Sequence, residues 1–296
     1  MQKPNLQPRA TNEALVYEQW LENQLREGSG IAPFNSGTPV KIVAEGDSWF
    51  NYIIGKDVVW WLRNRYKYDV IEVAYPGATL NHMAYGPDTK QIGDFDSSNP
   101  SQLAETIYAI KRHRPQLILL SGGGNDIAGP EFIQILKHVD SPAPGINPKV
   151  LEGLLDSYEE AYNTIIQSIG HALDRNSIDA KIILHGYDYP HPNGKSVGIG
   201  PIDFIGPWFE EPFESRGYSS KMMMLRRDLL RQVIDGFNGR LHKISDESNN
   251  NVIYLNLLGT LPEQSQWANE LHPTNIGFKL IAEKFHSAIT HLSAQD

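Results

Sequence analysis

One serine in the sequence stands where a nucleophile would be expected. The segment Ala44–Trp49 reads Ala-Glu-Gly-Asp-Ser-Trp and continues an apolar run, Val40–Ala44. A serine between a strand and a helix presents its hydroxyl to the crevice at the strand's carboxyl end, near the amides of the helix. Gly-Asp-Ser is also an ordinary turn and helix N-cap sequence. Ser48 is therefore a candidate nucleophile whose assignment depends on its partners.

Two further apolar runs end in groups that could stabilise an oxyanion. Val70–Ala74 is followed by Tyr-Pro-Gly-Ala, which contains Gly77, and Leu117–Leu120 is followed by Ser-Gly-Gly-Gly-Asn-Asp, which contains Asn125. Acyl chemistry needs preorganised N–H donors, and glycine allows a close approach to them. The glycines at 122–124 also suit a tight turn. They are not a P-loop, because no Lys-Ser/Thr follows them.

A candidate general base lies near the end of the chain. Residues 267–274 read Trp-Ala-Asn-Glu-Leu-His-Pro-Thr and lead into the last helical stretch. His272 sits there in a backbone restrained by proline, and it could accept the proton of Ser48 if the fold brings the two together. Asn269 and Glu270 are the nearest side chains able to orient its ring.

These four segments together resemble the SGNH hydrolase family, also called GDSL esterases and lipases. Gly46-Asp47-Ser48 is similar to the first block of that family, Gly77 to the second, Gly123-Gly124-Asn125-Asp126 to the third and His272-Pro273 to the fourth. The resemblance implies an α/β fold, a three-layer α/β/α flavodoxin-like arrangement with a five-stranded parallel sheet.

The resemblance also implies a reaction, the hydrolysis of a small-molecule acyl ester without metal or cofactor. Ser48 would attack the ester and His272 would take its proton. The Ser48 N–H, the Gly77 N–H and the Asn125 side-chain amide would hold the oxyanion. Trp49 stands where the family name has leucine, and we expect Trp49 and its neighbour Asp47 to contact the substrate.

A second departure from the family concerns the third member of the triad. The family usually has aspartate three residues before the histidine, and this chain has Asn269. An asparagine oxygen can orient an imidazole but lacks the charge that stabilises an imidazolium. Asn269 is favoured by position and Glu270 by charge, and a Ser-His dyad held by a backbone carbonyl is the third alternative. The missing charge also makes a weakened or silent ligand-binding or effector module an alternative function, and an acyltransferase is a further alternative as a close mechanistic relative of an esterase.

The elements that must position these residues alternate along the chain. Strands are predicted at Val40–Ala44, Val70–Ala74, Leu117–Leu120, Lys181–Leu184 and Val252–Leu255. Helical spacing is found at Asp57–Tyr66, Gln102–Arg112, Leu151–Asp174, Ser219–Phe237 and Thr274–Leu292. Such alternation predicts a parallel sheet covered on both faces, with ligands at the carboxyl ends of its strands.

The domain organisation predicted is an N-terminal helical extension at 1–39 and a hydrolase domain at 40–296, with insertions near 141–148 and 187–218. Tyr187 and Trp208 belong to the second insertion, whose aromatics would either line a substrate cleft or pack onto the domain. A Gly-x-Ser-x-Gly sequence around Ser196 lies in the same insertion, outside the strand-to-helix context that this motif needs. The three methionines at 222–224 are expected in the core.

Composition limits the partners. Lys and Arg number 26 against 35 Asp and Glu, a formal charge of −9, with no long basic run, so neither nucleic acid nor an anionic membrane is expected. The absence of cysteine excludes thiol nucleophiles and cysteine-ligated metals. The N-terminus lacks the apolar core of a signal peptide, and no stretch approaches ~20 apolar residues, so we expect a cytoplasmic protein without stable membrane insertion. The oligomeric state is left open.

Overall fold

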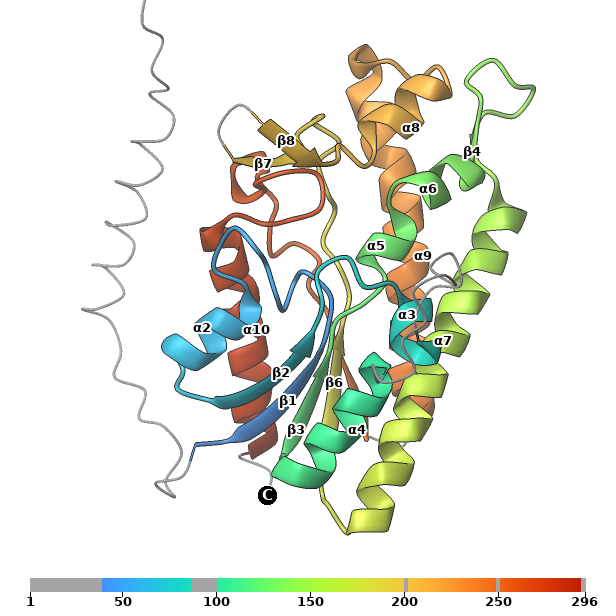
Figure 1. Ribbon diagram of the computed structural model, residues 1–296. Helices are drawn as coiled ribbons and strands as arrows, with labels where there is room; N and C mark the ends of the chain where they lie inside the picture. The colour runs from blue at the N-terminus through green and yellow to red at the C-terminus, as the bar shows by residue number, and fades with distance from the viewer. Residues whose placement is uncertain (1–38, 87–100, 200–201, 249–250, 294–296) are drawn as a thin grey trace, which may run out of the picture. The chain divides into compact units, whose positions relative to one another are not determined.

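A five-stranded parallel sheet forms the centre of the computed structural model, which describes residues 39–86, 101–199, 202–248 and 251–293 (Figure 1). All five predicted strands are present, and their order in the sheet is β2-β1-β3-β6-β9. Their bounds are β1 Lys41–Gly46, β2 Asp69–Ala74, β3 Leu117–Leu120, β6 Lys181–His185 and β9 Val252–Leu255. The predicted fold class is confirmed. The helical extension predicted for 1–39 lies almost wholly outside the described residues, so the domain division stays a prediction.

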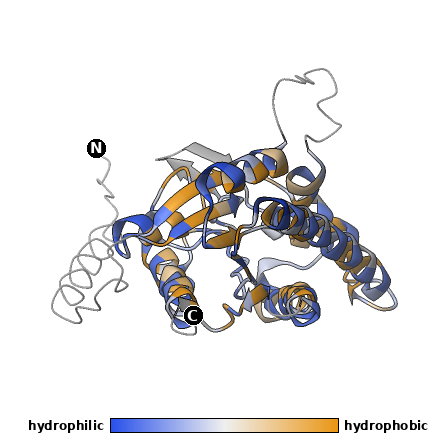
Figure 2. Cartoon of the chain, turned by 90° about the horizontal axis from the view of Figure 1, so that it is seen from below, coloured by the Kyte–Doolittle hydropathy of each residue, from blue (hydrophilic) through white to orange (hydrophobic). Residues whose placement is uncertain are grey.

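The apolar runs form strands because the sheet is covered on both faces. All four residues of β3 are buried, as are five of the six in β1. A strand buried on both sides needs continuous apolar sequence, which is what these runs provide. Figure 2 shows apolar residues along the strands and an alternation of polar and apolar residues along the long helices.

Two groups of helices cover the sheet (Figure 1). α2 and α10 pack together on one face, and α4, α7 and α9 cover the other. Asp57 caps α2 by accepting the Trp60 N–H at 2.7 Å, and Ser101 caps α4 by accepting the Ala104 N–H at 3.3 Å. The bounds are α2 Val58–Asn64, α3 Leu80–Tyr85, α4 Gln102–His113, α5 Gly124–Ile127, α6 Pro130–Ile135, α7 Pro148–Asn176, α8 Glu210–Ser215, α9 Met223–Glu247 and α10 Asn275–Ser293.

The strand order places a topological switch point next to Ser48. β1 lies between β2 and β3. If the five strands are numbered in chain order, their order across the sheet is 2-1-3-4-5, which is the flavodoxin-like order. Connections leave β1 and β3 toward opposite faces in this topology, which opens a crevice at their carboxyl ends. Ser48 follows β1 by two residues and Asn125 lies in α5, directly after β3.

The insertions contain short elements that the sequence did not indicate. Two small antiparallel hairpins pair β4 with β5 and β7 with β8, and two 3-10 turns, η2 and η3, flank the long loops. Ser196 directly precedes β7 of a hairpin, so its Gly-x-Ser-x-Gly sequence does not join a strand to a helix. The bounds are β4 Leu136–Lys137, β5 Gly145–Ile146, β7 Val197–Ile199, β8 Ile202–Ile205, η2 Ser220–Met222 and η3 Gln264–Gln266.

The methionine segment corrects one expectation. Met222 is 38% exposed and Met224 69% exposed, at the junction of η2 and α9. The prediction that these methionines lie in the core was wrong. They do lie at the start of a helix, α9, but no described element covers its first turn.

None of the described helices is long and apolar enough to cross a membrane.

Candidate active site

Ser48 and His272, 224 residues apart in sequence, meet at the carboxyl end of β1. The Ser48 Oγ lies 2.7 Å from the His272 Nε2, and both side chains are buried. The serine follows the strand in a tight turn in which the Phe50 and Asn51 N–H groups donate to the Asp47 carbonyl. The predicted nucleophile and base are thus in direct hydrogen-bond contact.

Asp47 fixes the turn that carries Ser48. Its Oδ1 accepts the Trp49 N–H at 3.0 Å and the Ser121 hydroxyl at 2.9 Å, and its Oδ2 accepts the Tyr187 hydroxyl at 3.3 Å. Burial raises the pKa of Asp47 to about 6, although these hydrogen bonds oppose the rise. Asp47 was predicted to contact the substrate. It lines the pocket, and its oxygens accept hydrogen bonds from Trp49, Ser121 and Tyr187.

Asn125 and Gly77 lie in adjoining turns at the same edge of the sheet. The Asn125 side-chain amide donates to the Ala78 carbonyl at 2.9 Å, which ties the turn after β3 to the turn after β2. Gly77 has a φ of +81°. Gly123 has a φ of +102°, and a Cβ there would lie 2.4 Å from the Phe237 ring, so only glycine fits. Of these residues, Asn125 lines the same pocket as Ser48.

Asn269 is the side chain that contacts the outer nitrogen of the His272 ring. Its Oδ1 lies 3.1 Å from the His272 Nδ1. The same oxygen accepts the backbone N–H groups of Leu271, at 2.9 Å, and His272, at 2.8 Å. The backbone donors fix the orientation of the amide, because its NH2 group could not face them. With Nδ1 protonated as the donor to Asn269, Nε2 is left free to accept the Ser48 proton.

Aromatic rings enclose His272. Tyr52 stacks on it with the ring centroids 4.6 Å apart, and Trp208 meets it edge-on at 5.6 Å. Burial lowers the pKa of His272 to about 3, because a charged imidazolium would lose its hydration there. The ring is therefore neutral near pH 7, which is the form that a general base needs.

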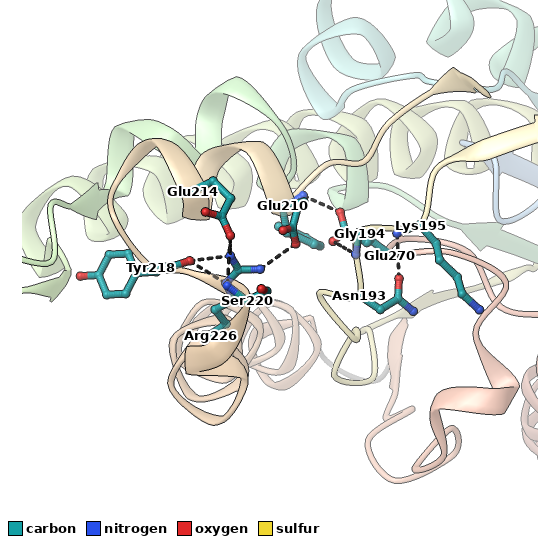
Figure 3. Close-up of polar contacts among 10 residues, drawn as sticks. Asn193, Gly194, Lys195, Glu210, Glu214, Tyr218, Ser220, Arg226 and Glu270 are labelled. Atoms are coloured by element: carbon teal, nitrogen blue, oxygen red, sulfur yellow. Dashed lines mark hydrogen bonds and ion pairs between the residues drawn. The ribbon is translucent and has the colours of Figure 1, made fainter. Parts of the chain in front are cut away.

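The Glu270 side chain points toward the 187–218 insertion (Figure 3). Its fully buried carboxylate accepts the Gly194 N–H at 3.0 Å and the Phe209 N–H at 2.6 Å. Burial raises its pKa, and these backbone donors oppose the rise. Of the two residues proposed to orient His272, the structure brings Asn269 to the ring and uses Glu270 to bind the insertion.

A second buried charge holds the same insertion. Arg226 of α9 is fully buried and pairs with Glu214 and, at 2.6 Å, with Glu210, both on α8 (Figure 3). It also donates to the Tyr218 carbonyl at 2.8 Å. Phe209 directly precedes α8. Glu270 therefore binds the residue before this short helix, and Arg226 binds two glutamates within it.

The aromatic side chains of the insertion divide between the lining of the pocket and the packing of the insertion onto the domain. Tyr187 and Phe209 line the pocket beside Ser48, whereas Phe213 and Tyr218 are buried in the packing around Arg226. Trp208 is half-buried against His272. Trp49 also lines the pocket and is itself buried, stacking on His185.

Comparison with known proteins bears on the fold. No protein-family model and no curated protein sequence matches the chain. Among solved structures, the lipase Lip_vut3 from a goat rumen metagenome is 13% identical, with a TM-score of 0.51 and coverage of 84% of this chain and 97% of that one. The chain shares the fold of this lipase, and its five-stranded parallel sheet has the three-layer α/β/α arrangement predicted for an SGNH hydrolase.

Two further solved structures are similar to a lesser degree. A candidate SGNH hydrolase from Slackia heliotrinireducens is 12% identical, with a TM-score of 0.45 over 85% of this chain and 100% of that one. A member of the lipolytic G-D-S-L family from Veillonella parvula is 16% identical, with a TM-score of 0.40 over 85% and 98%. At such identities and TM-scores, the chemistry must be argued from the site.

Several residues at the site were not found from the sequence, among them Ser121, Tyr52 and Ile234. Ser121 is the residue directly after β3, and its position beside Asp47 could have been found from the pairing of β1 with β3. Tyr52 carries no such signal, since it lies in an irregular loop. Ile234 was part of a predicted helix, but helical spacing does not tell which core residues border a pocket.

Proposed function

We propose that the protein is a serine hydrolase that cleaves acyl esters, with Ser48 as the nucleophile. The observation that carries the proposal is the 2.7 Å contact between the Ser48 Oγ and the His272 Nε2 at the edge of a pocket. Burial keeps His272 neutral, and a neutral imidazole whose Nδ1–H points at Asn269 has its Nε2 lone pair available for the serine proton.

The reaction follows in two halves. Ser48 Oγ attacks the ester carbonyl as its proton moves to His272 Nε2, and the carbonyl oxygen becomes an oxyanion. When the tetrahedral intermediate collapses, the bond to the alcohol breaks and His272 returns the proton to the leaving oxygen. Water then attacks the acyl-serine in the same way and releases the acid.

Three donors support the oxyanion in this proposal, namely the Ser48 N–H, the Gly77 N–H and the Asn125 side-chain amide. The bond from Asn125 to the Ala78 carbonyl uses one of the two N–H groups of the amide and leaves the other for the substrate. Such donors act mainly in the transition state, where the negative charge is largest.

Hydrolysis of p-nitrophenyl acetate by the wild type and by Ser48→Ala tests the proposal. We expect the substitution to lower the rate by at least about 10³-fold, while the free energy of unfolding changes by less than about 1 kcal/mol. Ser196→Ala is the matched control, since it removes the serine of the other motif, and it should keep full activity. A wild-type rate no higher than that of Ser48→Ala would indicate the silent module.

A further inference from the structure

The pocket beside Ser48 is small enough to restrict the acyl group. Its cavity volume is about 30 Å³. One water molecule requires roughly 10–15 Å³ on this measure, so the cavity has room for two or three non-hydrogen atoms. Ser48 and Asn125 both line it, and in the proposed reaction the acyl carbonyl lies between these two residues. The acyl chain therefore enters this space.

The walls of the pocket are parts of the core. Trp49, Tyr187, Phe209 and Trp267 form aromatic walls, and Ile127 and Ile234 form aliphatic ones; all six are at most 5% exposed. Side chains buried to this degree are packed on their far sides as well. They cannot retreat from a longer acyl chain without disturbing the core.

Hydrogen bonds fix the aromatic walls. The Trp49 Nε1 donates to the Leu271 carbonyl at 3.1 Å, and the Trp267 Nε1 donates to the Leu261 carbonyl at 3.1 Å. The Tyr187 hydroxyl accepts the Gly124 N–H at 3.1 Å. Turning any of these rings to enlarge the pocket would leave a buried polar group without its partner.

The charge of the lining disfavours an ionised acyl group. Asp47 and Asp188 are its two carboxylates, and no lysine or arginine belongs to the lining residues. Asp188 accepts the backbone N–H groups of Gly259, at 3.1 Å, and Leu261, at 2.5 Å. A second carboxylate in the acyl chain would meet these two acids without a cation to balance its charge.

We propose that the ester carries a short, neutral acyl group, acetyl or propionyl. This inference rests on the proposed function and names the substrate class of the same site. In the acyl-enzyme, the carbonyl oxygen lies at the Asn125 amide, and one or two carbons fill the cavity toward Ile234. Longer chains clash with the fixed walls.

A series of p-nitrophenyl esters tests the proposal on the wild-type protein. We expect kcat/KM to be highest for the acetate or propionate and to fall at least 10-fold by the hexanoate, since methylenes that exceed the cavity volume meet walls fixed by core packing and hydrogen bonds. A kcat/KM that is equal or higher for the hexanoate or octanoate would overturn the proposal.

Ile234→Ala locates the restriction. This substitution removes three carbons from one wall, and we expect the preferred ester to lengthen by one or two carbons. Ile244→Ala is the matched control, because Ile244 is buried in the same helix, α9, and does not line the pocket. It should keep the wild-type order of esters. An unchanged order in Ile234→Ala would place the acyl group elsewhere.

Failure of this inference is distinguishable from failure of the proposed function. If no ester is hydrolysed and a fluorophosphonate does not label Ser48, the hydrolase proposal itself is wrong. If Ser48 is labelled and the longer esters are the better substrates, the hydrolase proposal stands and the short-acyl proposal falls.

Discussion

The two sides of the pocket are built in different ways. On one side, Ser48 lies two residues after β1 and Asn125 lies in α5, five residues after β3, so the pairing of these two neighbouring strands sets where both segments begin. On the other side, His272 and Phe209 lie in irregular segments held by single side chains: the Asn269 oxygen accepts the His272 N–H, and the buried Glu270 carboxylate accepts the Phe209 N–H. The difference shows that the nucleophile side depends on many backbone bonds and the base side on a few side chains. Substitutions should therefore separate the two sides.

The largest effect is expected from Asn125→Ala on the strand side. Loss of one oxyanion donor should lower kcat about 10²–10³-fold, with a smaller change in KM. Asn51→Ala is the matched control, because the Asn51 amide donates to the Ala74 carbonyl at 2.9 Å and lies outside the pocket lining. Steady-state kinetics decide the matter. A change confined to KM would mean that Asn125 binds the ground-state substrate.

Asn269→Asp should improve the base side. One neutral oxygen of Asn269 now accepts three N–H groups. Its Nδ2 lies 3.4 Å from the Tyr52 hydroxyl, and an aspartate would place a second carboxylate oxygen there. We expect kcat to rise by about one to three orders of magnitude, given that the reverse change in a serine protease costs about 10⁴-fold.

The pH profile gives this substitution a second readout. The base works only when neutral, so kcat/KM falls as the pH drops through the pKa of His272, which burial lowers to about 3. A nearby carboxylate raises that pKa, and the acid limb of Asn269→Asp should move upward. Asn256→Asp, which adds the same charge beside the Leu258 N–H, should leave both rate and profile unchanged. Unchanged kinetics in Asn269→Asp would favour a Ser-His dyad.

Glu270→Gln should have an intermediate effect on kcat/KM, because it displaces the segment that Glu270 binds and does not change the pKa of His272. The amide would turn an NH2 group toward the N–H of Gly194 or Phe209, which loosens the wall beside Trp208 and His272. We expect kcat/KM to fall about 10-fold, mostly through KM, with the acid limb unmoved. Glu263→Gln, in the exposed cap of η3, is the control. A shifted acid limb in Glu270→Gln would show instead that its charge acts on His272.

Glu45→Gln should alter stability and leave activity unchanged. Neither Glu45 oxygen makes a hydrogen bond of normal geometry among the described residues, and burial raises its pKa to about 8, with a small opposing effect from the Thr106 hydroxyl. The folded state then holds the proton more tightly than the unfolded state between pH 4.5 and 8, so Glu45 lowers the free energy of unfolding as the pH rises. Urea unfolding at pH 5 and pH 8 should show Glu45→Gln gaining on the wild type. A constant difference would contradict this.

The same contrast explains what could be predicted from sequence. The five strands, the Ser48 turn and the place of His272 follow from apolar runs and the residues that end them. The contact between Asn269 and His272 could also be predicted, because the two residues are three positions apart in one short loop. The binding of Glu270 to the insertion was not, since its partners are backbone N–H groups up to 76 residues away. The exposure of the methionines depended on neighbours that the helical pattern does not specify.

Fluorophosphonate labelling followed by peptide mass spectrometry directly tests whether Ser48 is the activated nucleophile. The reagent reacts with a serine only where a neutral base and oxyanion donors activate it. We expect one adduct, on the peptide that contains Ser48. It should be lost in Ser48→Ala and in His272→Ala, and an excess of p-nitrophenyl acetate should slow its formation. An adduct on Ser196 or Ser121, or no adduct on the folded wild-type protein, would contradict it.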